Sequence, residues 1–195
     1  MKTIYILLLA LFFANTLFAQ DSPMNGLNVN DKAPNFELKD QNGKLVNLSN
    51  ELKNGSVILV FYRGQWCPYC TKQLTNLQDS INMITNKGAQ VIAITPEQKM
   101  NVDKTIAKTK ADFTIISDQN LELLNAYQVS FELDSATSTK YKTFGVNLEE
   151  SNGNNGNALP VPAVYVIGKD GKINYRYFNR DYKKRPTVKE LLTYL

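Results

Sequence analysis

The side chains best suited to carry out a reaction are those of Cys67 and Cys70, the two cysteines of the 195-residue chain. They lie in the segment FYRGQWCPYCTKQL, residues 61–74. In a helix, residues three positions apart share a face and are close enough for a disulfide. A loop this short stabilises a fold by only about 2 kcal/mol in the chain-entropy treatment, which makes a purely structural bridge the weaker alternative. The spacing therefore favours a redox-active pair.

The two thiols are expected to differ in reactivity. Cys67 is predicted at the N-terminus of a helix, where free N–H groups and the helix dipole stabilise an anion and lower a thiol pKa. Cys70 continues into the apolar stripe of Leu74 and Leu77, so we expect it to be enclosed. We predict that Cys67 attacks a substrate disulfide and that Cys70 resolves the mixed disulfide. The Cys67–Cys70 disulfide is then the redox centre, and no other cofactor is predicted.

Composition argues against several other chemistries. The chain contains no histidine, so Ser-His and Cys-His catalysis are unavailable, and two thiols alone do not complete a tetrahedral zinc site of the usual Cys/His kind. No metal site is predicted.

The formal charge is +4, too mild to predict a nucleic-acid partner. The densest basic stretch, residues 176–185, is interpreted as a solvated strand end and turn.

The first 19 residues resemble a cleaved signal peptide. Lys2 precedes a short apolar run, and Ala19 is a small residue suited to cleavage. The apolar run meets Asn15 before it is long enough to span a membrane, and no cysteine before Cys67 could carry a lipid. We therefore expect an exported, periplasmic protein without a stable membrane anchor. Residues 20–30 are predicted to be a polar leader, and residues 31–195 a single domain.

The elements that position the cysteines follow an α/β pattern. VILVFY, directly before the active segment, is typical of a strand buried on both faces. Pro68 suits the first position of a helix, and Lys87-Gly88 its end. Residues 130–158 show little periodicity, and 151–157 are predicted to be a flexible polar tract. The other predictions are a hairpin within 33–49, strands at 90–94 and 113–116, helices at 95–110 and 121–127, a hairpin over 163–178 and a closing helix from Val188.

These segments resemble a known family. W-C-P-Y-C after a buried strand, and a later strand entered through Val161-Pro162, are similar to the thioredoxin fold. The resemblance implies a mixed central sheet flanked by helices. It also implies a cis proline at Pro162 that lies against the cysteines and leaves the Val161 backbone free to pair with an extended substrate. APNFELKDQNGKLVNLS, VILVFYRGQWCPYCTKQL, LPVPAVYVIGKDGKI and DYKKRP together resemble the peroxiredoxin-like branch of the alkyl hydroperoxide reductase/thiol-specific antioxidant family.

The family motif P-x-x-x-T-x-x-C places its peroxide-attacking cysteine on Cys70. The threonine position is occupied by Cys67 and the proline position by Arg63. This departure favours thiol–disulfide exchange with protein disulfides or thiols as the leading hypothesis. The alternative is an antioxidant thiol peroxidase that reduces hydroperoxides. Either reaction requires an external thiol reductant or oxidant.

Three further residues near the pair are candidates for substrate binding. Trp66 is expected to shield the cysteines and offer a flat surface to a partner, although simple packing is an alternative. Tyr69 is expected to point outward from the first helical turn. Arg63 either lowers a thiolate pKa or binds an anionic substrate, or else faces solvent at a strand end.

Overall fold

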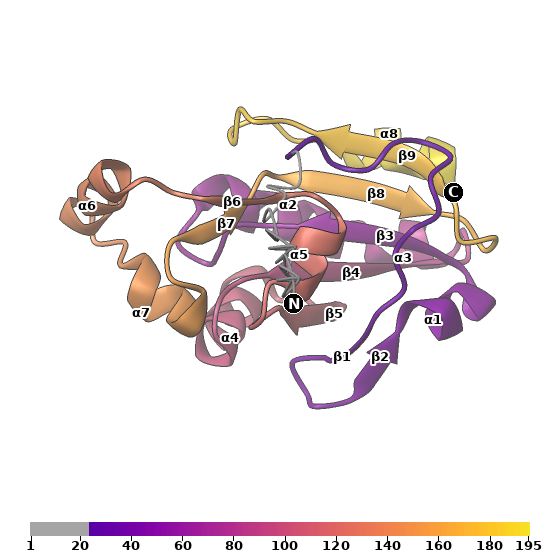
Figure 1. Cartoon of the computed structure of the whole chain (residues 1–195). Helices are drawn as coiled ribbons and strands as arrows, with labels where there is room; N and C mark the ends of the chain where they lie inside the picture. The colour runs from indigo at the N-terminus through magenta and orange to yellow at the C-terminus, as the bar shows by residue number, and fades with distance from the viewer. Residues whose placement is uncertain (1–23) are drawn as a thin grey trace, which may run out of the picture.

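The computed structural model describes residues 24–195, so the predicted signal peptide and the start of the polar leader lie outside the described residues. A mixed five-stranded sheet forms the centre, in the order β5-β4-β3-β8-β9 (Figure 1). Strands β3, β4 and β5 are parallel, whereas β8 runs antiparallel to both β3 and β9. The strands span Ser56–Phe61 (β3), Ala89–Thr95 (β4), Thr114–Ser117 (β5), Ala163–Ile167 (β8) and Ile173–Phe178 (β9). The α/β prediction is confirmed.

The central strand β3 is apolar from Val57 to Phe61, where both of its faces are covered. Val57, Leu59 and Phe61 enter one core layer, and Ile58 and Val60 enter the other. Such burial explains why the strand lacks the polar alternation of a half-exposed sheet. Its carboxyl end therefore leads the chain from a rigid core directly into the cysteine segment.

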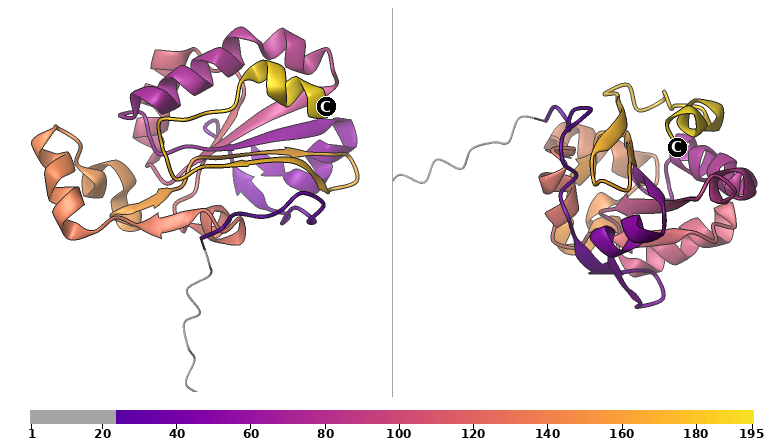
Figure 2. Two further views of the ribbon diagram at one scale, coloured as in Figure 1. Left: turned by 90° about the horizontal axis from the view of Figure 1, so that it is seen from above. Right: turned by 90° about the vertical axis from the view of Figure 1, so that its right-hand side faces the viewer.

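Helices cover both faces of the sheet, as the two views in Figure 2 show. One face carries α2, α3, α4 and α8, which share a core with Ile58 and Val60. The other face is covered by α1, α5 and the β1–β2 hairpin. The elements span Glu37–Lys39 (β1), Leu45–Asn47 (β2), Leu48–Asn54 (α1), Pro68–Asp79 (α2), Ile81–Thr85 (α3), Lys99–Thr109 (α4), Glu122–Ala126 (α5) and Val188–Leu191 (α8), the last continued by a 3-10 turn, Leu192–Tyr194.

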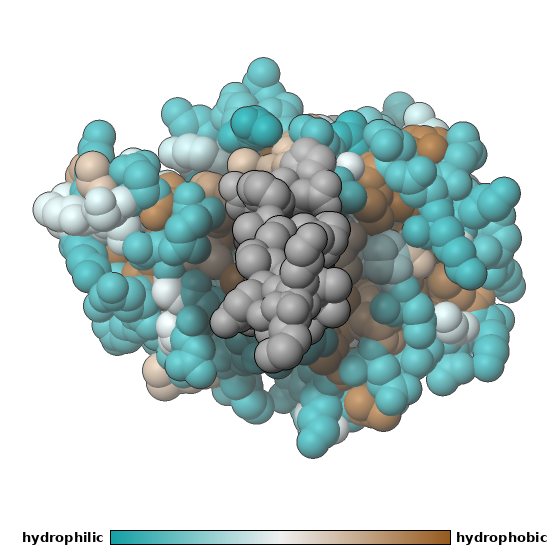
Figure 3. Space-filling model, viewed as in Figure 1, coloured by the Kyte–Doolittle hydropathy of each residue, from teal (hydrophilic) through white to brown (hydrophobic). Residues whose placement is uncertain are grey.

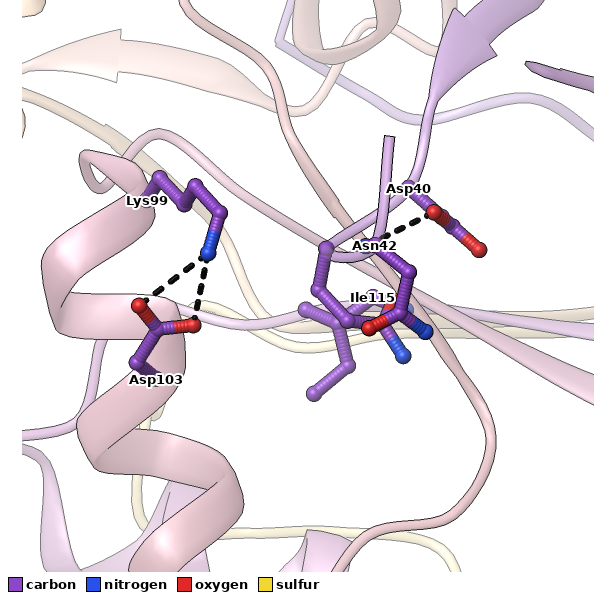
Figure 4. Close-up of polar contacts among 6 residues, drawn as sticks. Asp40, Asn42, Lys99, Asp103 and Ile115 are labelled. Carbon is purple, nitrogen blue, oxygen red and sulfur yellow. Dashed lines mark hydrogen bonds and ion pairs between the residues drawn. The ribbon is translucent and has the colours of Figure 1, made fainter. Parts of the chain in front are cut away.

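The predicted N-terminal hairpin is confirmed, and side-chain oxygens fix its turn. Asp40 Oδ1 accepts from the backbone N–H of Asn42 at 2.8 Å and of Lys44 at 2.9 Å. The neighbouring Gln41 accepts from the N–H of Ile115 at 2.7 Å, which ties the hairpin to β5. Figure 4 draws the Asp40–Asn42 contact of this turn and also the exposed Lys99–Asp103 ion pair of α4.

The helix that begins after Cys67 starts where predicted but ends earlier. Pro68 occupies the first turn of α2, and Leu74 and Leu77 are buried on its inner face. The helix ends at Asp79. The next residue, Ser80, has backbone angles of φ −105° and ψ 10°, which depart from the helical values, and α3 follows it. The next helix, α4, begins at Lys99 rather than near residue 95.

The segment 130–158, which shows little periodicity in the sequence, contains regular helices and strands, and the predicted flexible tract 151–157 includes the end of a helix and a 3-10 turn. The whole segment forms β6 (Ser130–Glu132), α6 (Ser135–Thr143), α7 (Leu148–Asn152), a 3-10 turn (Gly153–Asn155) and β7 (Ala158–Pro160). Asn155 Nδ2 donates to the carbonyls of Pro96 and Asp118, each at 2.9 Å. Buried polar side chains therefore replace an apolar stripe here, and helices α6 and α7 project from one end of the sheet (Figure 1).

The face seen in Figure 3 is mainly hydrophilic and is interrupted by small apolar patches. Across residues 24–195, none of the helices combines the length and the apolarity required to span a bilayer.

Candidate functional site

The two cysteines lie where β3 gives way to α2. Cys67 is the N-cap of the helix and Cys70 occupies its first turn. The backbone N–H of Cys70 donates to the Cys67 carbonyl at 3.0 Å, which fixes the turn that joins them. Both are free thiols, and their exposed fractions are 1% for Cys67 and 0% for Cys70. The structure therefore brings the two sulfurs together inside the fold, next to the sheet.

The Cys70 sulfur is surrounded by hydrogen-bond donors. Nη2 of Arg185 donates to it at 3.4 Å. Burial alone would raise the pKa of Cys70, but the hydrogen bond from Cys67, the charge and hydrogen bond of Arg185 and the backbone N–H of Arg63 outweigh it. They lower the pKa of Cys70 to about 6. A thiolate at this position is thus the stable form at neutral pH.

The surroundings of Cys67 shift its thiol pKa in the opposite direction. Its hydrogen bond to Cys70 and its burial both raise the pKa of its thiol, and the nearby charge of Arg63 does not reverse this. The pair shares one proton on Cys67 and one negative charge on Cys70. The prediction that Cys67 carries the lowered pKa is therefore wrong. Its side chain makes no capping bond to the helix N-terminus, and the strongest cation contact is made to Cys70.

Arg185 is the residue that sequence reasoning missed most clearly. The stretch 176–185 was expected to be a solvated turn, yet Arg185 reaches back to the first turn of α2. Its Nε donates to Gln73 at 2.7 Å, and its Nη1 donates to the carbonyls of Tyr182 and Lys184 at 2.6 Å each. These bonds hold the guanidinium against Cys70, 115 positions away in sequence. Arg185 lies within DYKKRP, one of the segments that resemble the family, but the sequence alone showed no secure match for the later arginine of that family.

Arg63 is enclosed by aromatic rings instead of facing solvent. It is 3% exposed, and its guanidinium carbon lies 5.0 Å from the ring centre of Trp66, 5.5 Å from Tyr141 and 4.6 Å from Tyr182. Its Nη2 donates to the Tyr141 hydroxyl at 2.6 Å. We call Arg63, Trp66, Tyr141 and Tyr182 the Arg63 cage. Tyr141 belongs to α6, in the segment expected to be irregular, so the sequence did not reveal it.

A cleft of about 460 Å³ opens beside the Arg63 cage. Cys67 lines this cleft, whereas Cys70 does not. Tyr69 is 37% exposed, so the prediction that it points outward is confirmed. Its ring meets that of Tyr182 edge to face, with 5.9 Å between the ring centres. One wall comes from α6 and the turn after it. The lining residues are Arg63, Trp66, Cys67, Pro68, Tyr69, Thr137, Lys140, Tyr141, Phe144, Val146 and Tyr182.

The prediction for Val161 and Pro162 is wrong in two respects. Within residues 24–195 the chain has no cis peptide bond, so Pro162 is trans, as most prolines are. The N–H of Val161 is also occupied, since it donates to the carbonyl of Val129 at 2.8 Å. Both residues line a second hollow on the other side of the Arg63 cage, away from the cleft that contains Cys67.

Glu97 is a buried acid that the sequence analysis did not single out. Glu97 follows β4 in the chain, and its side chain is buried. Its carboxylate accepts hydrogen bonds from the N–H of Gln65 at 2.8 Å and from Ser151 Oγ at 2.6 Å. It therefore links the loop before the cysteines to helix α7. Burial raises the pKa of Glu97 to about 7. Among residues 24–195, no three His, Cys, Asp or Glu side chains gather closely enough to hold a metal.

The fold and the paired thiols at the start of α2 define a member of the AhpC/TSA family within the thioredoxin-fold superfamily. The AhpC/TSA family model matches residues 29–176. Within this family the chain is peroxiredoxin Q/Bcp-like, as its relatives show. The predicted family and the predicted thioredoxin-like fold are both confirmed.

Peroxiredoxin Q of Arabidopsis thaliana is 30% identical over 196 residues, which cover 94% of this chain and 80% of that protein. Peroxiredoxin Q of Oryza sativa subsp. japonica is 31% identical over 148 residues, which cover 76% of this chain and 58% of the rice protein. The chain thus spans less than two thirds of the rice relative. The crystal structure of peroxidoxin BcpB from Mycobacterium tuberculosis superposes with a TM-score of 0.66 at 22% identity, covering 86% of this chain and 96% of BcpB.

These relatives overturn the leading functional hypothesis. A thiol–disulfide oxidoreductase was expected because Cys67 and Arg63 replace two residues of the peroxiredoxin motif. The similar proteins that cover most of the chain are nevertheless peroxiredoxins of the Q and Bcp type. The ionisation of the two thiols agrees with this correction. The family motif places its attacking cysteine at Cys70, and Cys70 is the thiol with the lowered pKa.

Proposed function

We propose that the protein is a peroxiredoxin Q/Bcp-type thiol peroxidase that reduces hydroperoxides with Cys70 as the attacking sulfur. The observation that carries this proposal is the Cys70 thiolate, held between Arg185 and the protonated Cys67. A thiolate is the reactive form of cysteine, so the ionised Cys70 is the sulfur that is ready to attack a peroxide.

The reaction is proposed in two steps within the protein. The Cys70 thiolate attacks the terminal oxygen of ROOH, the O–O bond breaks, and RO⁻ takes a proton to leave as ROH. Cys70 is then a sulfenic acid. The Cys67 sulfur attacks the Cys70 sulfur, water leaves, and the Cys67–Cys70 disulfide forms. The short spacing of the two residues in the first turn of α2 makes this second step intramolecular.

An external dithiol, such as a thioredoxin-like protein, would complete the cycle. Cys67 lines the open cleft and Cys70 is enclosed, so the reductant is proposed to attack the Cys67 sulfur. The leaving group is then Cys70, whose low pKa and contact with Arg185 favour its departure as a thiolate. Attack on the Cys67 sulfur therefore regenerates the Cys70 thiolate directly.

Both sulfurs are nearly buried, so a hydroperoxide reaches Cys70 only when side chains at the base of the cleft move. Trp66 and Cys67 line the cleft and Cys70 does not, so we propose that movement of these side chains admits a small peroxide. The likeness of the first 19 residues to a signal peptide supports a further proposal, that this activity is exported to the periplasm.

Stopped-flow oxidation of the reduced protein by hydrogen peroxide tests the assignment. Cys70→Ser should abolish rapid oxidation, because the attacking sulfur is gone. Cys67→Ser should retain the first step and accumulate a sulfenic acid at Cys70 that dimedone traps, because the resolving sulfur is missing. The two variants are matched controls for each other. Rapid oxidation of Cys70→Ser with dimedone labelling of Cys67 would reverse the roles. Oxidation of the reduced protein no faster than that of a free thiol would refute the peroxidase.

A further inference from the structure

The second hollow, on the side of the Arg63 cage away from Cys67, has a volume of about 270 Å³. Its apolar wall includes Phe131 and Leu133, on and after β6, and Pro160 and Val161, at the end of β7. Two arginines complete it, Arg63 from the loop after β3 and Arg180 from the turn after β9. We call it the Arg63–Arg180 hollow.

The charge around this hollow is unbalanced. None of its lining residues is acidic. The acid next to Arg180 in sequence, Asp181, pairs instead with Lys184 at 3.9 Å. Glu132, between Phe131 and Leu133, is exposed and does not line the hollow. Two guanidinium groups therefore face one small, largely apolar space.

Arg63 has donors left over. It is 97% buried, yet its Nε has no hydrogen-bond partner among the described residues. Among the described residues, the hydrogen bond from Nη2 to Tyr141 is the one side-chain hydrogen bond of Arg63, and the rings of Trp66 and Tyr182 lie 5.0 and 4.6 Å from its guanidinium carbon. A buried charge without a hydrogen-bonded counter-ion is costly, and an anion at that edge would offset the cost.

We propose that the Arg63–Arg180 hollow binds a small carboxylate with a short apolar chain. Guanidinium groups recognise carboxylates through paired N–H donors, and the apolar wall suits a hydrocarbon chain. The limited volume favours a small molecule over a protein segment. The hollow shares Arg63, Tyr141 and Tyr182 with the cysteine cleft but contains neither cysteine. The proposal does not depend on the peroxidase function.

The protein contains its own reporter for the test. Trp66 is the one tryptophan of the chain and lies 5.0 Å from the Arg63 guanidinium. Hexanoate should change its fluorescence in a saturable way when titrated into the reduced protein without peroxide. Butanoate should bind about tenfold less tightly, because two methylene groups fewer are buried. Hexanol at the same concentrations should have no saturable effect, because it lacks the charge.

Two variants that each remove one positive charge separate the hollow from general electrostatics. Arg180→Gln should weaken hexanoate binding two- to tenfold. Lys169→Gln, in the turn at the far end of the β8–β9 hairpin, should leave it unchanged. Arg63→Gln should abolish binding if it folds, and Arg180→Gln keeps the test valid if it does not. No saturable response to hexanoate, equal binding of hexanol, or equal effects of Arg180→Gln and Lys169→Gln would each overturn the proposal. Peroxide oxidation, measured separately, tests the peroxidase function whatever the binding result.

Discussion

Replacing Arg185 by glutamine should slow the reaction with peroxide at neutral pH by weakening the thiolate at Cys70. The Arg185 guanidinium is one of three donors to this sulfur, and its charge also lowers the pKa of the thiol. Glutamine keeps much of the length and a hydrogen-bonding end but removes the charge. The expected effect is therefore electrostatic and is confined to the ionisation of Cys70.

The structure sets the size of this effect. A hydrogen bond to a charged group contributes about 1.5–3 kcal/mol, and one pKa unit corresponds to about 1.4 kcal/mol. Losing the contact should raise the Cys70 pKa from about 6 to roughly 7–8. The ionised fraction at pH 7 then falls from about nine tenths to between a half and a tenth. The rate with peroxide at pH 7 should fall about two- to tenfold.

The assay is a pH series of stopped-flow oxidation rates, with ultraviolet absorbance of the thiolate as a second readout in the Cys67→Ser background. The fold deficit of Arg185→Gln should grow as the pH is lowered from 9 to 6 and should nearly vanish at pH 9, where Cys70 is ionised in both proteins. Lys184→Gln removes the same charge from the exposed neighbour and should have little effect. A deficit of equal size at every pH, with an unchanged thiolate titration, would refute the ionisation argument.

Two further predictions concern Glu97, a buried acid next to the site, and Gly55, which directly precedes β3 at the end of the strand away from the cysteines. Glu97 has a folded-state pKa of about 7 against an ordinary value of 4.5, so the stability it contributes below pH 4.5 is lost as pH rises through 7. The unfolding free energy of the wild type relative to Glu97→Gln should fall by about 3 kcal/mol between pH 4.5 and 8 in urea titrations, and a constant difference would contradict this. Gly55→Ala places Cβ 1.8 Å from the Gly88 carbonyl oxygen and should lower stability by about 1–3 kcal/mol, whereas an unchanged urea midpoint would contradict that overlap.

Local patterns were sufficient to predict the scaffold of the site. The apolar run of β3, the proline at the first turn of α2 and the Asp170-Gly171 turn between β8 and β9 each depend on neighbours in sequence. The same holds for the pairing of the two cysteines in one helical turn. These features could be predicted because backbone propensity and side-chain periodicity determine them before any tertiary contact forms.

The walls of the site could not be predicted in this way. Tyr141 reaches the Arg63 cage from α6, a helix whose sequence, SATSTKYKT, has no apolar stripe. The following segment is buried through hydrogen bonds, as Asn152 shows by donating to the carbonyls of Gly156 and Ala158 at 3.0 Å each. Polar residues that are buried in this way look like a loop in the sequence. Only the position of their hydrogen-bond partners in the fold distinguishes such a buried polar segment from an exposed loop.

The roles of the two thiols depend on a comparison of magnitudes that the sequence does not contain. A helix N-terminus stabilises an anion by about 0.3–1 kcal/mol, and this general effect pointed to Cys67. A charge-assisted hydrogen bond contributes about 1.5–3 kcal/mol, and the one from Arg185 reaches Cys70 instead. Cys67 then keeps its proton and donates it to the neighbouring sulfur, which strengthens the asymmetry. The larger, long-range contribution reverses the local one, so the sulfur that sequence reasoning placed in the resolving role is the one that the folded chain ionises.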